Sequence, residues 1–249
     1  MSGHSKWSQI KRQKGVADAK RGQLFTKLAR EIGVAVRQGG ADPQANFKLR
    51  LIVQKARDSN MPLENIDRAI KRASGGTDGA ALSEVTYEGY GPGGSAILVH
   101  VLTDNKNRTL AEVRNILSRG GGNLGESGSV TWLFESRGVI NIDGTKENAE
   151  EVALYAIDAG AEDVKIEGTT LEVNTKPQDL EAVRRALEQR RVPISSSELS
   201  MVPKTMVKLD EKSAVQALKL LDKLEELDEV QRVYTNADFP DEVVSKYQG

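Results

Sequence analysis

Cationic side chains crowd the first third of the chain, and the chemistry open to them is phosphate binding. Residues 1–75 contain sixteen Lys and Arg against six Asp and Glu, a net charge of +10, whereas the remainder carries −11. Cations that neutralise phosphates release condensed counterions from a nucleic acid, so a segment of this charge is typical of a polyanion-binding surface. We therefore predict nucleic acid as the partner. A basic surface that docks on the acidic remainder of the same chain is the alternative.

Residues 2–21 contain many of these cations but few apolar side chains, so we expect no independent hydrophobic core there. Trp7 is the main exception, and its ring could stack on a base or pack against its own domain. Further cations follow at intervals as far as Arg72. The predicted nucleic-acid contacts are His4, Lys6, Trp7, Lys11, Arg12, Lys14, Lys20, Arg21, Lys27, Arg30, Arg50, Arg57, Lys71 and Arg72.

The segment GYGPGG, residues 89–94, matches the G-x-G-x-x-G pattern of dinucleotide sites in form only. That pattern requires a helix directly after it, whereas here the strand-like AILVHVLT follows, and Pro92 lacks an amide donor. We predict a hairpin loop, whose glycine backbone could approach a partner closely or could form an ordinary turn.

The segment DNKNR, residues 104–108, lies between a predicted strand and a predicted helix. Polar side chains and free amides at a helix start could hold an anion, although capping of the helix by Asn107 explains the same residues. The candidate loop contacts in the two segments are Tyr90, Gly91, Asn105, Lys106 and Arg108.

Catalytic and metal-binding residues are hard to assemble from this sequence. It contains no cysteine and only two histidines, His4 and His100, neither of which is placed beside a nucleophile or a second metal ligand. His100 lies within an apolar run, which favours a core or interface histidine. We predict no enzyme activity, no catalytic residue, no metal and no cofactor.

The basic residues after residue 22 are predicted to lie on three helices. Phe25, Leu28, Ile32 and Val36 recur at steps of three and four, which predicts a helix over 23–38. Asp42 followed by Pro43 predicts an N-cap and the start of a second helix, which continues to about residue 57. Pro62 then begins a third helix. These helices form a predicted basic domain, residues 1–75, and the Gly-rich segment after it is predicted to be a hinge.

Beyond the hinge the period of the apolar residues changes to that of strands. The pattern predicts β-α-β ending in a strand over 129–135, a complete β-α-β-β-α-β unit, and a further β-α-β from residue 205. The outer halves together make a second unit of this kind. We predict an α+β multidomain protein, with an N-terminal three-helix domain and two ferredoxin-like α+β domains, one inserted in the other. The predicted α+β boundaries are 76–134 with 205–249, and 135–204.

The cellular location follows from the apolar content. The longest apolar run is far shorter than the roughly twenty residues of a spanning helix, and no apolar stretch follows the basic N-terminus as in a signal peptide. Together with the lack of cysteine, this predicts a cytoplasmic protein that does not contact a membrane.

Several strings across the chain resemble the YebC/PmpR family. They are GHSKW at 3–7, RGQLFTKLAREI at 21–32, GGADPQANFKLR at 39–50, NMPLENIDRAIKR at 60–72, YEGYGPGG at 87–94 and DNKNRT at 104–109. The resemblance covers nearly the whole chain. It implies three domains, one helical and two α+β, and a function either in transcription, as DNA-binding regulators, or in translation, as in the related mitochondrial activator.

Three functional hypotheses follow. The first is a DNA-binding transcriptional regulator that acts through the basic helical domain. The second is a ribosome-associated translation factor that uses the same face on ribosomal RNA and relieves stalling, because phosphate contacts alone do not distinguish the two nucleic acids. The third is a regulator whose ferredoxin-like domains sense a small ligand. The sequence predicts neither the target sequence nor the oligomeric state.

Overall fold

A computed structural model describes residues 18–75, 82–143, 149–167 and 170–247. Its contacts divide the chain into two compact units. The inner unit is Glu135–Val202, and the outer unit consists of the described residues up to Phe134 and from Pro203 onwards. Each unit is described separately below.

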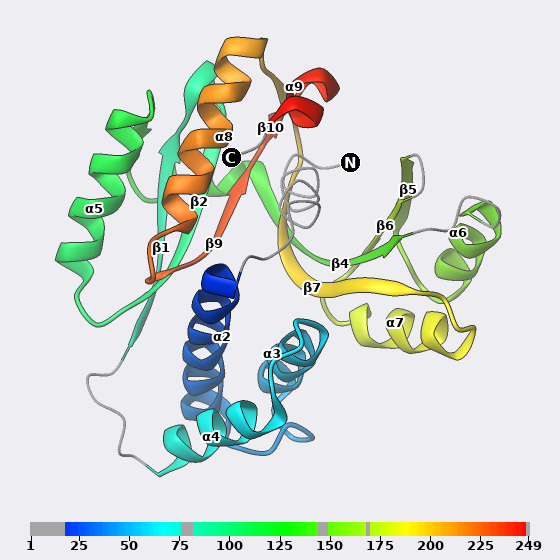
Figure 1. The fold of residues 1–249 in the computed structure, drawn as a ribbon. Coiled ribbons are helices and arrows are strands. Elements are labelled where there is room, and N and C mark those ends of the chain that lie inside the picture. The colour runs from blue at the N-terminus through cyan, green and yellow to red at the C-terminus, as the bar shows by residue number, and fades with distance from the viewer. Residues whose placement is uncertain (1–17, 76–81, 144–148, 168–169, 248–249) are drawn as a thin grey trace. The chain divides into compact units, whose positions relative to one another are not determined.

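The outer unit begins with three helices (Figure 1), which are α2 (Asp18–Gly39), α3 (Phe47–Asp58) and α4 (Leu63–Ser74). One apolar cluster joins them. Its buried members include Leu28, Ile32, Leu49, Ile52 and Ile66. The stripe predicted on the first helix is therefore the buried face of α2, as its three- and four-residue spacing requires.

The second helix starts four residues later than the sequence predicted. Asn46, rather than Asp42, is the N-cap of α3, since its Oδ1 accepts a hydrogen bond from the amide of Leu49 at 3.0 Å. The buried Asn46 Nδ2 also donates to the carbonyls of Ala35 and Gly40, at 2.8 and 2.9 Å. These contacts with the end of α2 decide where α3 begins, and they are invisible in the local sequence.

A four-stranded sheet forms the centre of the outer unit's α+β part. Its strands are β1 (Ser83–Tyr90), β2 (Ala96–Thr103), β3 (Asn123–Leu124) and β9 (Val230–Thr235), in the order β3-β1-β2-β9. Two helices, α5 (Lys106–Arg119) and α8 (Glu211–Glu225), share one core with this sheet (Figure 1). Ile97, Val99 and Val101 alternate along β2 and contribute to that core. Leu98 and Leu102, on the other face of the strand, are also buried.

The inner unit is a complete β-α-β-β-α-β fold, as predicted. Its elements are β4 (Phe134–Asp143), α6 (Ala149–Asp158), β5 (Asp163–Glu167), β6 (Thr170–Thr175), α7 (Leu180–Gln189) and β7 (Ile194–Pro203). The strand order is β5-β6-β4-β7. The outer sheet also has four strands, but its order, β3-β1-β2-β9, connects them differently along the chain. The α+β fold class is confirmed.

Two predicted strands of the outer unit are wrong in detail. The segment predicted as a strand over 129–135 contains a short 3-10 helix, η2 (Thr131–Leu133), and β4 starts only at Phe134. The strand predicted at residue 205 is the two-residue β8 (Val207–Lys208), which pairs in parallel with β10 (Ala237–Asp238) outside the main sheet. A short 3-10 turn, η1 (Pro92–Gly94), and a final helix, α9 (Asp241–Lys246), complete the described elements.

Among the described residues, the helices are too short or too polar to cross a lipid bilayer.

Candidate nucleic-acid interface

The predicted nucleic-acid contacts fall into two groups with respect to the structure. His4, Lys6, Trp7, Lys11, Arg12 and Lys14 lie outside the described residues, and Lys20 belongs to α2 without a described side chain. Arg21, Lys27, Arg30, Arg50, Arg57, Lys71 and Arg72 are described. Only the second group can be placed by geometry.

Two of the described cations on α2 bind the outer unit's own backbone. Lys27 Nζ donates to the carbonyl of Glu225 at 2.6 Å, and Arg30 Nη1 donates to the carbonyl of Asp228 at 2.5 Å. Both carbonyls lie at or just beyond the C-terminal end of α8, where main-chain oxygens lack helical partners and cations are favoured. These two side chains therefore tie the helical region to the α+β part of the same unit.

Neighbouring residues strengthen the same contact. Gln23 Nε2 donates to the carbonyl of Glu226 at 2.8 Å, and an ion pair joins Arg232 of β9 to Glu31 of α2 at 3.8 Å. The alternative inferred from charge, a basic surface docked on the acidic remainder, anticipated contacts of this kind. It could not identify the partners, which lie about two hundred positions apart. Acidic residues around the end of α8 were the only available hint.

Arg50 also has an internal role. Its Nη1 donates to the carbonyls of Pro43 and Gln44, at 3.2 and 3.0 Å, and its guanidinium lies 5.5 Å from the centre of the Phe47 ring. Arg50 thus holds the turn that connects α2 to α3. A phosphate would have to compete with these carbonyls for the same nitrogen.

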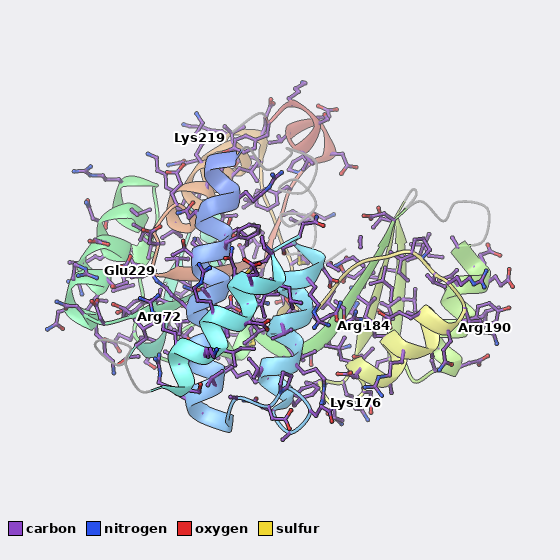
Figure 2. The ribbon with its side chains drawn as sticks, turned by 60° about the horizontal axis from the view of Figure 1, so that its bottom comes forward. Arg72, Lys176, Arg184, Arg190, Lys219 and Glu229 are labelled. Atoms are coloured by element: carbon purple, nitrogen blue, oxygen red, sulfur yellow. The ribbon has the colours of Figure 1, made fainter. Side chains whose placement is uncertain are left out.

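The cations of α4 are arranged differently. Arg68, Lys71 and Arg72 are exposed, and their spacing of three and four places them along one side of the helix, away from the buried Ile66. Figure 2 labels Arg72 on this helix. Within the described part of the chain, neither Arg68 nor Lys71 has a hydrogen bond or ion pair through its side chain. We call Arg68, Lys71 and Arg72 the α4 stripe.

Arg57 is a further exposed cation, in the last turn of α3. Like Arg68, it makes no side-chain contact of this kind with another described residue. Arg21 is exposed near the start of α2. Arg21 and Arg57 belong to α2 and α3, so these cations are described separately from the α4 stripe.

The GYGPGG loop is packed against its own unit. Gly91 is buried, Ser95 Oγ donates to the carbonyl of Pro92 at 3.0 Å, and a Cβ added to Gly93 would lie 2.5 Å from Leu209. The Tyr90 hydroxyl donates to the carbonyl of Ser129 at 3.2 Å. Glycine is needed here for close packing within the molecule, which is the ordinary-turn interpretation.

In the DNKNR loop, Asn105 rather than Asn107 caps the following helix, accepting from the amide of Arg108 at 3.1 Å. The Arg108 guanidinium bridges Asp104 and Glu229, at 2.8 Å to each. The hydrogen bond to Glu229, followed by the charge of Asp104, raises the pKa of Arg108. The Lys106 side chain is exposed. Arg108 thus already has two carboxylate partners.

A buried carboxylate that sequence reasoning missed organises the loop between β3 and η2. Glu88 accepts hydrogen bonds from the amides of Gly128, Val130 and Thr131, at 2.6, 2.8 and 2.8 Å. Burial by itself would raise the pKa of Glu88, but the three amides outweigh it and hold the pKa below its ordinary value. Glu88 therefore fixes the backbone that leads into η2.

Trp132 lies on this organised segment and is 65% exposed. Its Nε1 donates to the carbonyl of Ser129 at 3.0 Å. Lys204 Nζ in turn donates to the carbonyl of Trp132, also at 3.0 Å. The signal that could have drawn attention to Trp132 is an aromatic residue within a segment rich in Gly and Ser, but the predicted strand placed it in a sheet.

His100 is half-buried on β2, as its apolar context predicted. Its ring meets that of Tyr234 edge to face, with centroids 5.0 Å apart. Burial lowers the pKa of His100 to about 4, and the positive charge of Arg232 acts in the same direction. His100 is therefore neutral near pH 7, and its surroundings favour a packing role.

The small-ligand hypothesis can be compared with one surface of the inner unit. A groove of about 440 Å³ lies between α6 and β5. Its apolar lining includes Leu154, Ile157 and Ile166, which are 66%, 47% and 45% exposed. Small-molecule sites usually enclose most of their ligand, and this groove does not have that form.

The architecture and the exposed cations define a class of protein: an α+β multidomain protein with a basic helical region, in which the described residues form no cluster of metal ligands. Family models identify the chain more closely. Residues 5–76 match the TACO1/YebC protein N-terminal domain, and residues 82–237 match the TACO1/YebC second and third domain. The chain therefore belongs to the TACO1/YebC family, which confirms the resemblance seen in the sequence.

Relatives of the same length support this assignment. A probable transcriptional regulatory protein from Dehalococcoides mccartyi (strain BAV1) is 56% identical over 99% of this chain and 98% of its own. One from Chloroflexus aurantiacus is 53% identical, over 99% of each chain. A crystal structure of a conserved hypothetical protein from Aquifex aeolicus has a TM-score of 0.82 and 46% identity, over 90% of this chain and 92% of that one. The two named relatives are described as regulators and not as enzymes.

Proposed function

We propose that this protein is a cytoplasmic transcriptional regulator that binds duplex DNA through its basic helical region. The observation that carries the proposal is the α4 stripe, whose three cations are exposed on one side of a helix. Relatives that are 53–56% identical over nearly the full length are named probable transcriptional regulatory proteins. The predicted cations of residues 4–20 and Arg57 complete the proposed surface.

The α4 stripe suits phosphate binding for a physical reason. Arg68 and Lys71 have no competing hydrogen bond or ion pair among the described residues, so a phosphate would meet cations that need not leave another partner. Lys27, Arg30 and Arg50 differ because each already donates to a main-chain carbonyl. We therefore remove those three from the proposed contact set and keep them as residues that hold the helical region in place.

Equilibrium binding to a labelled duplex at several salt concentrations tests the proposal. If about six phosphates are neutralised, log affinity falls with log salt at a slope of roughly −5. Joint replacement of Arg68, Lys71 and Arg72 by Ala should reduce the slope by roughly three and weaken binding to all duplexes alike.

A matched variant separates a local site from a general charge effect. Lys212, Lys219 and Lys223 are exposed on α8, and their replacement by Ala changes the net charge by the same amount. Figure 2 labels Lys219 on α8 and Arg72 on α4. Equal weakening by the two triple variants would contradict a site on α4.

Ribosomal RNA provides the remaining comparison, because its phosphates would bind the same cations. Binding to promoter duplex and to purified ribosomes is measured at matched salt. We expect the tighter, saturable binding to be that of the duplex. Saturable binding to ribosomes, with only salt-sensitive and sequence-independent binding to DNA, would replace the DNA target with a ribosomal one.

A further inference from the structure

Trp132 presents an unusual surface for a folded protein. Its side chain is 65% exposed, although tryptophan is among the residues that bury the largest share of their area on average. The exposed ring belongs to η2, and none of the residues of η2 is buried. The ring is therefore available to a molecule outside the chain.

The ring is presented on a fixed backbone. The Glu88 carboxylate binds the amides of Val130 and Thr131, directly before Trp132, at 2.8 Å each. The indole Nε1 donates to the carbonyl of Ser129, which fixes the edge of the ring at 3.0 Å. A Cβ added to Gly125 would overlap Ser129 Oγ, so the loop is also closely packed. A ring held in this way loses little conformational entropy when it binds.

The contacts already made around Trp132 restrict what it can bind. A peptide strand would require free main-chain donors, but the amides of Gly128, Val130 and Thr131 are taken by Glu88. The indole N–H is also occupied. The face of the ring is therefore the part of Trp132 that can bind another molecule. Aromatic side chains bind unpaired bases by stacking on them through this face.

A cation accompanies the ring. Lys204 Nζ lies 3.0 Å from the carbonyl oxygen of Trp132, and the side chain is exposed. An ammonium group has three N–H donors, so two remain beyond this hydrogen bond. An exposed aromatic ring and an ammonium group bound at the carbonyl of the same residue match a base and the phosphate that adjoins it.

We propose that Trp132 and Lys204 form a stacking site for an unpaired nucleobase and its neighbouring phosphate, separate from the α4 stripe. The ring takes the base, Lys204 takes the phosphate, and Glu88 acts as a positioning residue by holding the loop. The site is sequence-tolerant, because every base offers a π-face. This proposal does not depend on duplex DNA binding by the helical region.

Intrinsic fluorescence provides the test, because the chain contains only two tryptophans. In the full-length Trp7→Phe variant, Trp132 is the sole indole. Titration with oligothymidylate and with oligouridylate should quench its emission. An abasic oligomer of equal length, which keeps the phosphates and lacks the bases, should not. Quenching by DNA only, by RNA only or by both supports the site and identifies its source of bases.

Binding of labelled single strands to variants with native Trp7 adds a second measurement. Trp132→Ala should weaken binding by about tenfold, within the range measured for loss of one stacked base, and Trp132→Phe should retain most of it. Lys204→Ala should reduce the salt slope for single strands by about 0.7. Because Trp132 is exposed, the Ala variant should keep the wild-type unfolding temperature.

Two results of the titration with the Trp7→Phe variant would overturn the proposal. One is unchanged emission of Trp132 when the single strand is saturating, and the other is equal quenching by the abasic oligomer. The variant that lacks the α4 stripe separates this site from the proposed function. Quenching that persists in that variant supports an independent site, whereas quenching that disappears with duplex binding assigns all contacts to the helices and also overturns it.

Discussion

The ammonium group of Lys27 lies 2.6 Å from the main-chain oxygen of Glu225, the last residue of α8. One of the cations that give the N-terminal third its positive charge is thus used inside the molecule. The charge of a segment therefore overstates the number of its cations that are available to a phosphate. The same contact leads to the first of four predictions.

Replacement of Lys27 by Met should destabilise the outer unit by about 1–2 kcal/mol, because the carbonyl of Glu225 loses its charged donor. Arg37→Ala is the matched control, since Arg37 is exposed in the last turn of the same helix. It should change stability by less than about 0.5 kcal/mol. Thermal unfolding monitored by circular dichroism measures both, and equal effects would refute a special role for Lys27.

The lowered pKa of the half-buried His100 predicts a loss of stability in mild acid. Its pKa is about 4 in the folded protein and about 6.5 in an unfolded chain. The unfolded chain therefore binds more protons between these values, and stability falls as the pH drops from 6.5 towards 4. The loss from this residue is at most about 3 kcal/mol.

A substitution tests whether His100 causes that dependence of stability on pH. His100→Gln removes the titrating group, so its unfolding free energy should vary less than that of the wild type between pH 6.5 and 4. Urea titrations at a series of pH values give the two curves. Parallel curves would show that other groups cause the wild-type dependence.

Glu88→Gln should loosen the loop that carries Trp132. The variant loses three charge-assisted acceptor contacts, at a cost of about 1–3 kcal/mol. Amide hydrogen exchange should accelerate at Gly128, Val130 and Thr131. Glu126→Gln, an exposed change in the same loop, should leave these rates unaltered.

The lowered pKa of Glu88 adds a pH component with a definite sign. Its stabilisation is complete above the ordinary glutamate pKa and is lost as the pH falls through the lower pKa of the folded state. The difference in stability between wild type and Glu88→Gln should therefore shrink in strong acid. A difference that grows there would contradict the assignment.

Gly122→Ala tests the close packing between β1 and the turn after α5. A Cβ at Gly122 would overlap the main-chain oxygen of Tyr90, which cannot move without disturbing the sheet. We expect a loss of about 1–3 kcal/mol. Gly22→Ala is the opposite case, because nothing lies within 4 Å of its added Cβ, and it should raise stability by about 0.5–1 kcal/mol. Chemical denaturation of both variants checks the contrast.

The parts of the fold that could be predicted are those whose signals are local. The helical stripe of Leu28 and Ile32 requires only periodicity, and the inner unit's elements follow each other without interruption. The start of α3 was missed because Asn46 is held by carbonyls of the preceding helix. The strand predicted around Trp132 was wrong because the amides of Val130 and Thr131 bind Glu88, about forty residues earlier.

The candidate interface was less predictable than the fold for a related reason. The composition gives the number of cationic side chains. Whether a cation is available to a phosphate depends on the partners that it already has in the fold. Lys27 and Arg30 have carbonyl partners 198 positions away, and no local pattern distinguishes them from the exposed Arg68. The spacing that places Arg68 beside Lys71 and Arg72 is local, and it was visible in the sequence.

The insertion of the inner unit affects the order in which the molecule can form during synthesis. The amide of Lys204 donates to the carbonyl of Leu133 at 2.9 Å, so the chain leaves and re-enters the outer unit at adjacent points. The inner unit can fold as soon as it emerges from the ribosome, since all its strands are consecutive. Strand β9 and the carbonyls that receive Lys27 and Arg30 are made after the inner unit. A nascent chain therefore carries these two cations without their carbonyl partners until residues 225–228 have been made.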